Sequence, residues 1–116
     1  MSAQTATSAT SASIATQIII PNAAVLIQAA KIAIQYDRPI QLDYYVDTAQ
    51  AKAFLVEDSE NKDNRVLLKS RDEYTSLITK VLKEGDDYIV LTENSIYITN
   101  SKMSKKRFPL SSLAQD

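Results

Sequence analysis

The residues available for chemistry in this chain are carboxylates, lysines and serines, because the chain has no histidine and no cysteine. Histidine is the usual acid–base group at neutral pH, and histidine and cysteine are the usual ligands of zinc and other soft metals. The single glycine, Gly85, cannot build either of the common phosphate-binding loops. The absence of histidine and cysteine, together with the single glycine, excludes most familiar enzyme designs. We expect no cofactor and no metal site.

A serine activated by a neighbouring lysine is one catalytic arrangement that remains open. Lys69 precedes Ser70, and Ser101 precedes Lys102. Adjacent residues of a strand point to opposite faces, so neither pair is placed for proton transfer. We therefore predict a protein that is not an enzyme and has no catalytic residues.

Two acidic segments come closest to a metal or acid–base site. Residues 58–63 (DSENKD) resemble the start of a calcium loop, but Asp63 stands where such a loop needs glycine. Lys69 stands where the closing glutamate would be. Asp86 and Asp87 are consecutive in an expected turn, where polar residues are common. Both segments are predicted to be solvated turns.

The one basic cluster, in residues 102–107, has the residue types for contact with phosphate. Its cations are Lys102, Lys105, Lys106 and Arg107. The whole chain has a net charge of −1, and no aromatic platform for stacking bases is evident. We expect a solvated strand edge whose lysines discourage edge-to-edge pairing, and nucleic-acid binding through residues 102–107 is the alternative.

The distribution of charged side chains divides the sequence into an uncharged N-terminal stretch and a charged remainder. No charged side chain occurs before Lys31, while the whole chain carries 13 basic and 14 acidic residues. We predict a low-complexity N-terminal arm (1–20), a globular domain (21–100) and a basic C-terminal tail or edge segment (101–116).

A targeting or membrane role for the uncharged N-terminal stretch is not indicated. Residues 1–13 lack the basic start and the apolar core of a secretory signal, and no arginine precedes Arg38. The apolar run 14–34 is interrupted by polar residues and by Pro21, so it is a poor membrane span. We expect no membrane-spanning segment.

The arm ends in an apolar triplet, Ile18, Ile19 and Ile20, which Pro21 biases toward an extended conformation. A monomer would not leave three isoleucines exposed. We expect them to add a strand either to a sheet edge of their own domain or to that of another subunit. Both arrangements use the same backbone hydrogen bonds, so the sequence does not distinguish between them.

A helix is predicted from Pro21-Asn22 to about Tyr36, with Asn22 as its N-cap. Two apolar stripes run along it, one of Leu26, Ala30 and Ala33 and the other of Val25, Ala29 and Ile32, and Ile27 and Ile34 extend the apolar surface. A helix that is apolar over most of its circumference is either buried on a sheet or lies at an interface.

Strand patterns follow the helix. They cover residues 40–45, 51–56, 65–69, 75–82, 88–91 and 95–99. Gly85 marks one turn, Glu93-Asn94 a second, and Pro109 limits any further strand to an edge. The fold predicted is α+β, with one N-terminal helix packed on a five- or six-stranded antiparallel meander or small barrel. The core is expected to comprise Leu26, Ala30, Ala33, Leu42, Phe54, Leu67, Ile89, Leu91, Ile96 and Ile98.

Two consecutive tyrosines, Tyr44 and Tyr45, fall in the first predicted strand. Within a strand one of them must face away from the core. An outward tyrosine indicates a protein interface, and we assign Tyr45 to that role.

Residues 72–76 (DEYTS) and 92–97 (TENSIY), after a helix that ends at 38–40 (RPI), resemble small uncharacterised proteins of large icosahedral DNA viruses. These are the giant viruses of algae and amoebae, and the similarity covers about residues 22–100. The resemblance implies a virion- or capsid-associated protein, but no functional residue carries across.

The missing catalytic groups and the apolar N-terminal third indicate a structural or assembly protein. We expect protein partners, with a homo-oligomer or a larger assembly, and we do not expect nucleic acid as the main partner. The virus resemblance adds the role of a minor capsid component, located in the virion or the host cytoplasm. Without it, the expected location is cytoplasmic.

Overall fold

Two four-stranded sheets form the body of the protein in a computed structural model that describes residues 20–114. The elements are α2 (Ala23–Tyr36), β2 (Ile40–Gln41), α3 (Tyr45–Ala49), β3 (Phe54–Asp58), β4 (Arg65–Ser70), β5 (Glu73–Tyr74), β6 (Ile78–Glu84), β7 (Asp87–Thr92), β8 (Ile96–Thr99), β9 (Lys105–Phe108) and the 3₁₀ helix η1 (Leu110–Ala114). None of the helices within this range has the length and hydrophobicity needed to cross a membrane.

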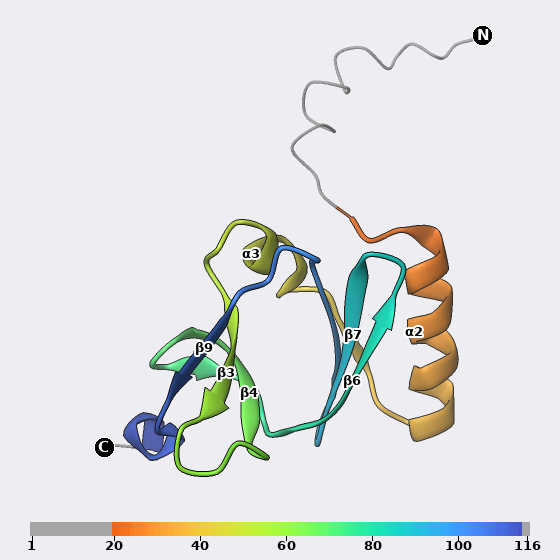
Figure 1. Cartoon of the computed structure of the whole chain (residues 1–116). Helices are drawn as coiled ribbons and strands as arrows, with labels where there is room; N and C mark the ends of the chain where they lie inside the picture. The colour runs from red at the N-terminus through yellow and green to blue at the C-terminus, as the bar shows by residue number, and fades with distance from the viewer. Residues whose placement is uncertain (1–19, 115–116) are drawn as a thin grey trace, which may run out of the picture.

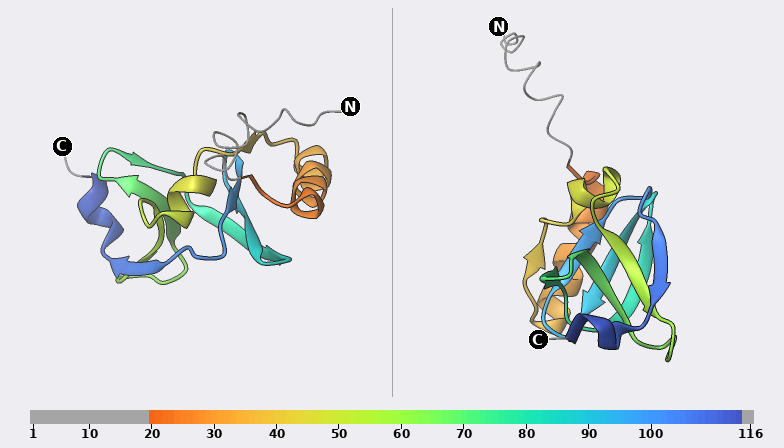
Figure 2. Two further views of the ribbon diagram at one scale, coloured as in Figure 1. Left: turned by 90° about the horizontal axis from the view of Figure 1, so that it is seen from above. Right: turned by 90° about the vertical axis from the view of Figure 1, so that its left-hand side faces the viewer.

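The sheets and helices are stacked in layers (Figure 1). The first sheet has the order β2-β8-β7-β6, and the second has the order β5-β4-β3-β9. Seen from above, α2 covers the outer side of the first sheet, the second sheet lies on the other side, and η1 lies at the far end (Figure 2).

The predicted α+β fold with an N-terminal helix is confirmed, but the antiparallel meander or barrel is wrong. Hairpins connect β6, β7 and β8, and another connects β3 with β4. Two pairs are parallel, β2 with β8 and β3 with β9. The eight strands form two mixed sheets that do not close into a barrel.

Helix α2 begins and ends where the sequence indicates. The Asn22 side chain accepts a hydrogen bond from the Ala24 backbone N–H at 2.8 Å, which confirms the N-cap. Asp37 ends the helix with a left-handed backbone, φ 56°, and its N–H bonds to the Ala33 carbonyl. Arg38 then donates to the Thr92 carbonyl at 2.6 Å, which ties the end of α2 to the turn between β7 and β8.

Of the two apolar stripes on α2, the one with Val25, Ala29 and Ile32 is buried against the first sheet. Leu26 and Ala33 are only partly buried at the edge of this contact. The expected core position of Ala30 is wrong because Ala30 is exposed. The buried stripe has two large aliphatic residues, Val25 and Ile32, whereas the other has only Leu26 beside two alanines.

Strand β7 is buried on both faces. Ile89 and Leu91 belong to the cluster that packs against α2. Val90 points the other way, into the cluster with Leu55 and Leu67 between the two sheets. This two-sided burial explains the continuous apolar run of β7. The predicted core positions of Leu67, Ile89, Leu91, Ile96 and Ile98 are confirmed.

The C-terminal segment is part of the second sheet. Strand β9 pairs with β3 along the sheet edge, and Pro109 follows it, as predicted for an edge strand. A third cluster, built on Val56, Val66 and Leu68, packs under η1 and takes in Phe54 and Phe108. Phe54 is only partly buried there.

The strand predicted over residues 40–45 is wrong beyond Gln41. The chain turns through a hydrogen bond from the Tyr45 N–H to the Leu42 carbonyl, and α3 begins at Tyr45. Leu42 is half-exposed and lies outside the core. Successive helical residues are rotated by about 100°, not the 180° of a strand, so Tyr44 and Tyr45 both turn inward, toward different clusters. The outward orientation expected for Tyr45 is therefore wrong.

Replacing Ile89 by alanine is expected to lower the free energy of unfolding by about 2–5 kcal/mol, because it leaves a cavity between α2 and the first sheet. Leu42→Ala is the matched control, and its half-exposed side chain should leave stability within about 1 kcal/mol of the parent. Urea unfolding followed by far-UV circular dichroism measures both. Equal effects of the two variants would contradict the packing of α2 on β7.

Candidate functional site

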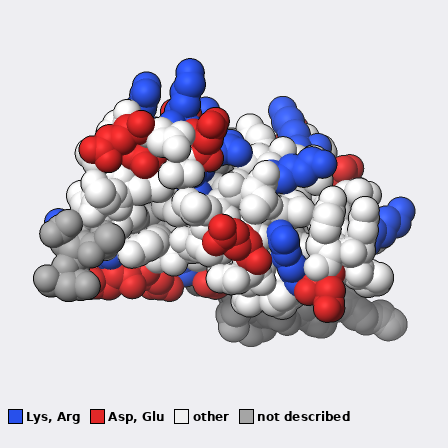
Figure 3. All heavy atoms as spheres, turned by 90° about the horizontal axis from the view of Figure 1, so that it is seen from below, with Lys and Arg blue, Asp and Glu red and all other residues white. Residues whose placement is uncertain are grey.

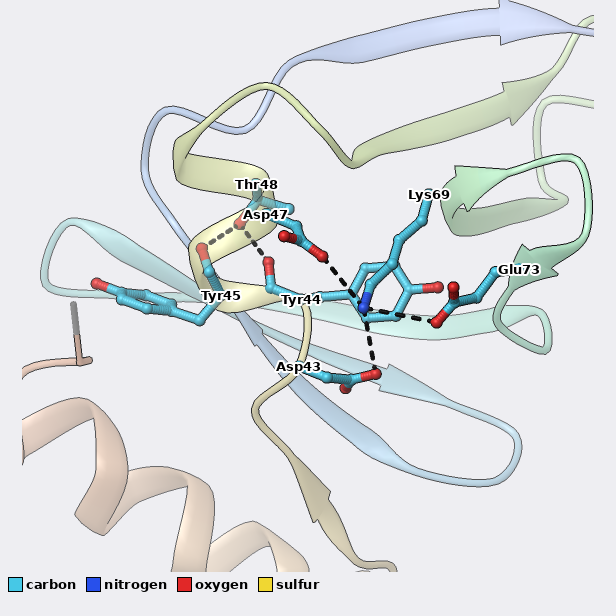
Figure 4. Close-up of polar contacts among 7 residues, drawn as sticks. All are labelled: Asp43, Tyr44, Tyr45, Asp47, Thr48, Lys69 and Glu73. Atoms are coloured by element: carbon cyan, nitrogen blue, oxygen red, sulfur yellow. Dashed lines mark hydrogen bonds and ion pairs between the residues drawn. The ribbon is translucent and has the colours of Figure 1, made fainter. Parts of the chain in front are cut away.

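The densest polar cluster of the described chain surrounds Lys69 of β4 (Figure 4). Its Nζ lies 3.1 Å from Asp47 Oδ2, 3.5 Å from Asp43 Oδ2 and 3.6 Å from Glu73 Oε2. The Lys69 side chain is only 17 % exposed. We call Lys69, these three carboxylates and Tyr44 the Lys69 cluster.

Tyr44 connects this cluster to the first sheet. The Lys69 ammonium lies 4.5 Å from the centre of the Tyr44 ring, within range of a cation–π interaction. The Tyr44 ring meets that of Tyr97 on β8 edge to face, with centroids 5.2 Å apart and an angle of 81°. Lysine and two tyrosines thus form a column from the second sheet to the first.

The environment of Lys69 keeps it charged. Burial acts to lower its pKa, but the hydrogen bond to Asp47 and the charges of Asp43, Asp47 and Glu73 outweigh burial and raise it. Burial, together with the neighbouring Tyr97 and the carboxylates, also raises the pKa of Tyr44. A lysine that stays protonated is neither a nucleophile nor a base, so the cluster acts as an electrostatic tie between elements.

The prediction that the two acidic segments are solvated turns is wrong for Asp58 and Asp87, which are buried residues of β3 and β7. Asp87 is buried and accepts hydrogen bonds from the Tyr45 hydroxyl at 2.8 Å and from the Ser101 N–H at 3.2 Å. Asp58 accepts from the N–H groups of Glu60 at 3.0 Å and Leu110 at 3.3 Å. Within residues 20–114 no group of three or more candidate ligands could hold a metal ion.

Two hollows have room for a ligand. One, of about 500 Å³, opens at the start of α2 beside Asp86 and Asp87, whose carboxylate is already engaged by Tyr45. The other, of about 300 Å³, is lined largely by apolar residues near η1, where the Ser76 hydroxyl is buried without a partner. The first is lined mainly by polar residues, among them Glu84, Asp86 and Asn100, and the second mainly by apolar ones.

The basic segment is spread over β9 and the turn before it. Lys105, Lys106 and Arg107 are all exposed on β9, while Lys102 lies in the preceding turn. Adjacent strand residues face opposite sides, and the Lys106 ammonium lies over the Phe54 ring at 4.3 Å. On the face of the molecule drawn in Figure 3, positive and negative side chains are interspersed.

The most exposed of the large apolar side chains belong to α2 and the residues just before it. Ile34 is 83 % exposed, Ile20 69 % and Ile27 57 %. Ala23 and Ala30 are exposed on the same side of the helix. We call Ala23, Ile27, Ala30 and Ile34 the α2 outer face.

The residues predicted for the interface are placed differently. Ile20 is exposed at the entry to α2, while Tyr45 is buried, with 5 % of its surface exposed. Its pKa is raised to about 12 by burial and by the hydrogen bond to Asp87. Ile18 and Ile19 lie outside the described residues.

Sequence reasoning missed the Lys69 cluster altogether. Lys69 and Glu73 are four positions apart in the sequence. Asp43 and Asp47 are distant from Lys69 in the sequence and reach the cluster because the chain turns into α3. The α2 outer face had a clear signal, because Ile27 and Ile34 extended the apolar surface beyond one stripe.

Comparison with known proteins adds no relative. No protein-family model matches the chain, and neither the curated proteins nor the solved structures contain a match. By its geometry, the part of the chain at residues 20–114 is an α+β domain of two mixed sheets, with an exposed apolar face on α2.

Replacing Lys69 by methionine should lower the free energy of unfolding by about 1–3 kcal/mol, since three carboxylates lose their common counter-charge. The carboxylates are partly solvated, which keeps the loss below that of a fully buried pair. Lys80→Met, at an exposed position of β6, is the control and should change stability little. An equal, small effect of both variants in urea unfolding would show that the cluster contributes no stability.

Stability should also fall as the pH rises from 10 to about 12, the ordinary and the raised pKa of Tyr45. In this window the unfolded chain gives up the phenolic proton while the folded chain keeps it, so rising pH favours unfolding. The raised pKa values of Tyr44 and Lys69 act with the same sign. Urea unfolding across the pH series should show a shallower fall for Tyr45→Phe, and identical slopes for parent and variant would exclude this role of Tyr45.

Proposed function

We propose that this protein is a non-catalytic assembly component that makes protein–protein contacts through the α2 outer face and Ile20. The observation that carries the proposal is the exposure of Ile27 and Ile34 on one side of α2, while Ile20 is exposed separately beside the hollow at the start of the helix. Large exposed apolar patches are uncommon on monomeric proteins and mark surfaces that bind other proteins.

The state of the polar groups supports a role without catalysis. Lys69 is held in its charged form by three carboxylates. The carboxylates of Asp58 and Asp87 bind backbone or tyrosine groups within the fold. Lys69, its three carboxylates, Asp58 and Asp87 therefore already have structural tasks.

The virion setting belongs to the same proposal. The resemblance to small proteins of large DNA viruses favours a minor capsid component located in the virion or the host cytoplasm. A homo-oligomer or a larger protein assembly fits the uncovered α2 outer face. Without the viral setting, the same proposal places the protein in the cytoplasm.

Nucleic-acid binding is the second candidate. The observation in its favour is the run of three exposed cations, Lys105, Lys106 and Arg107, on an edge strand. Against it, the alternating strand divides these cations between two faces, and Arg107 lies in register with Glu57 of β3. We therefore rank it below protein assembly.

Sedimentation velocity on the full-length chain is expected to show a mass that increases with protein concentration. Fluorescence anisotropy with labelled DNA and RNA is expected to show only weak binding. The double variant Lys105→Glu/Lys106→Glu should leave the sedimentation profile unchanged. A monomer at all concentrations that binds nucleic acid tightly, with affinity that falls steeply with salt and is lost in the double variant, would overturn the proposal in favour of the second candidate.

A further inference from the structure

The α2 outer face has a regular spacing. Its residues, Ala23, Ile27, Ala30 and Ile34, are separated by four, three and four positions, which places them on one side of a helix. The buried residues of α2 lie on the opposite side, against the first sheet. Figures 1 and 2 show that no other described element covers the side of α2 that points away from the sheet.

We infer that a second copy of this chain covers this face, with the two α2 helices packed antiparallel about a twofold axis between Ile27 and Ala30. This inference rests on the proposed assembly function and names its partner and geometry. Such a contact is isologous, so each helix presents the same four residues to the other.

The order of residue sizes carries the antiparallel geometry. About the axis, Ile27 lies opposite Ala30 of the second copy, and Ala23 lies opposite Ile34. Every layer then combines one alanine with one isoleucine, so the two helices can keep a constant separation. A parallel pair would alternate layers of two alanines with layers of two isoleucines, and would leave gaps in the former or crowd the latter.

The charges of α2 agree with a second copy as the occupant. The four residues of the outer face are uncharged, and Lys31 is the only charged residue within α2. Lys31 follows Ile27 by four positions and lies at the border of the face, where its ammonium stays in solvent. A charged partner would find no counter-charge on the face itself, whereas a second α2 presents a neutral face of the same composition.

The size of the contact predicts its strength. A helix of 14 residues is about 21 Å long, so a contact limited to one face of each α2 is small beside the roughly 1,200–2,000 Å² that stable interfaces bury. Ile20 lies beside the hollow at the start of α2, with Val25 and the turn between β6 and β7, and adds nothing to this contact. We therefore expect a dimer that dissociates on dilution.

The first experiment compares charge substitutions on two sides of α2. Ile34→Lys and Ile27→Lys should weaken the dimer roughly a hundredfold or more in sedimentation equilibrium, because each dimer loses two buried isoleucines. Gln35→Lys adds the same charge at an exposed position outside the face and should leave the dissociation constant within a few-fold of the parent. Circular dichroism verifies that each variant is folded, as the exposure of Ile34 leads us to expect.

The second experiment tests the orientation, using the absence of native cysteine. Ala23→Cys and Ile34→Cys are prepared separately and then oxidised alone and as a mixture. In the antiparallel pair, residue 23 meets residue 34 of the other copy, while identical residues are about 16 Å apart, beyond the reach of a disulfide. Rapid disulfide formation only in the mixture is the expected result.

The remaining outcomes overturn the inference, and they separate it from the proposed function. Rapid disulfides in each variant alone would indicate a parallel pair. An oligomer whose mass is unaffected by Ile34→Lys, and is lost on deletion of residues 1–19, would indicate assembly through the arm. It would overturn the α2 outer face as the contact surface and leave only the assembly role of the proposed function. A chain that is monomeric at every concentration would exclude the second copy as the occupant.

Discussion

Burial of both faces of β7 determines the order of the layers. Ile89 and Leu91 need an apolar cover on one side, which α2 supplies, and Val90 needs one on the other, which the second sheet supplies. A strand in this position cannot lie at the surface, so the first sheet is held between a helix and another sheet. Since α2 covers the sheet with one side only, its opposite side is left outside the domain. The burial of β7 thus explains why one side of α2 lies outside the domain, and the isoleucines are on that side.

The contact between the sheets combines apolar packing with one electrostatic tie. Tyr44 lies between Lys69 of the second sheet and Tyr97 of the first, in a segment that connects the two. The apolar clusters favour burial without fixing orientation, because hydrophobic contact is non-directional. The Lys69 ammonium, bound to carboxylates of α3, its preceding turn and β5, fixes the position of that segment. Tyr45 and Asp87 add a second directional contact, from α3 to the first sheet.

Helix ends and tight turns depend on neighbouring residues, and the sequence predicted them correctly. Asn22 and Asp37 bound the helix, and Gly85, with φ 61°, forms the turn between β6 and β7. Features that depend on contacts between distant residues were not predicted. The alternation at residues 40–45 is typical of a strand, yet a turn and a short helix allow both tyrosines to be buried. The parallel pairs and the Lys69 cluster join segments that share no local pattern.

The two parallel pairs have a consequence for the order of folding. Ile40 pairs with Ile96 and Leu55 with Lys105, so both pairs must close long stretches of chain. The hairpins of β6, β7 and β8 are local and can form first, whereas pairings of large sequence separation form slowly. Until residues 105–108 have been synthesised and have docked, β3 retains an unpaired edge that can recruit strands of other chains. When β9 docks, it covers that edge with a strand rich in lysine and arginine. The outer edge of the second sheet then carries lysine and arginine, a composition that disfavours pairing with further strands.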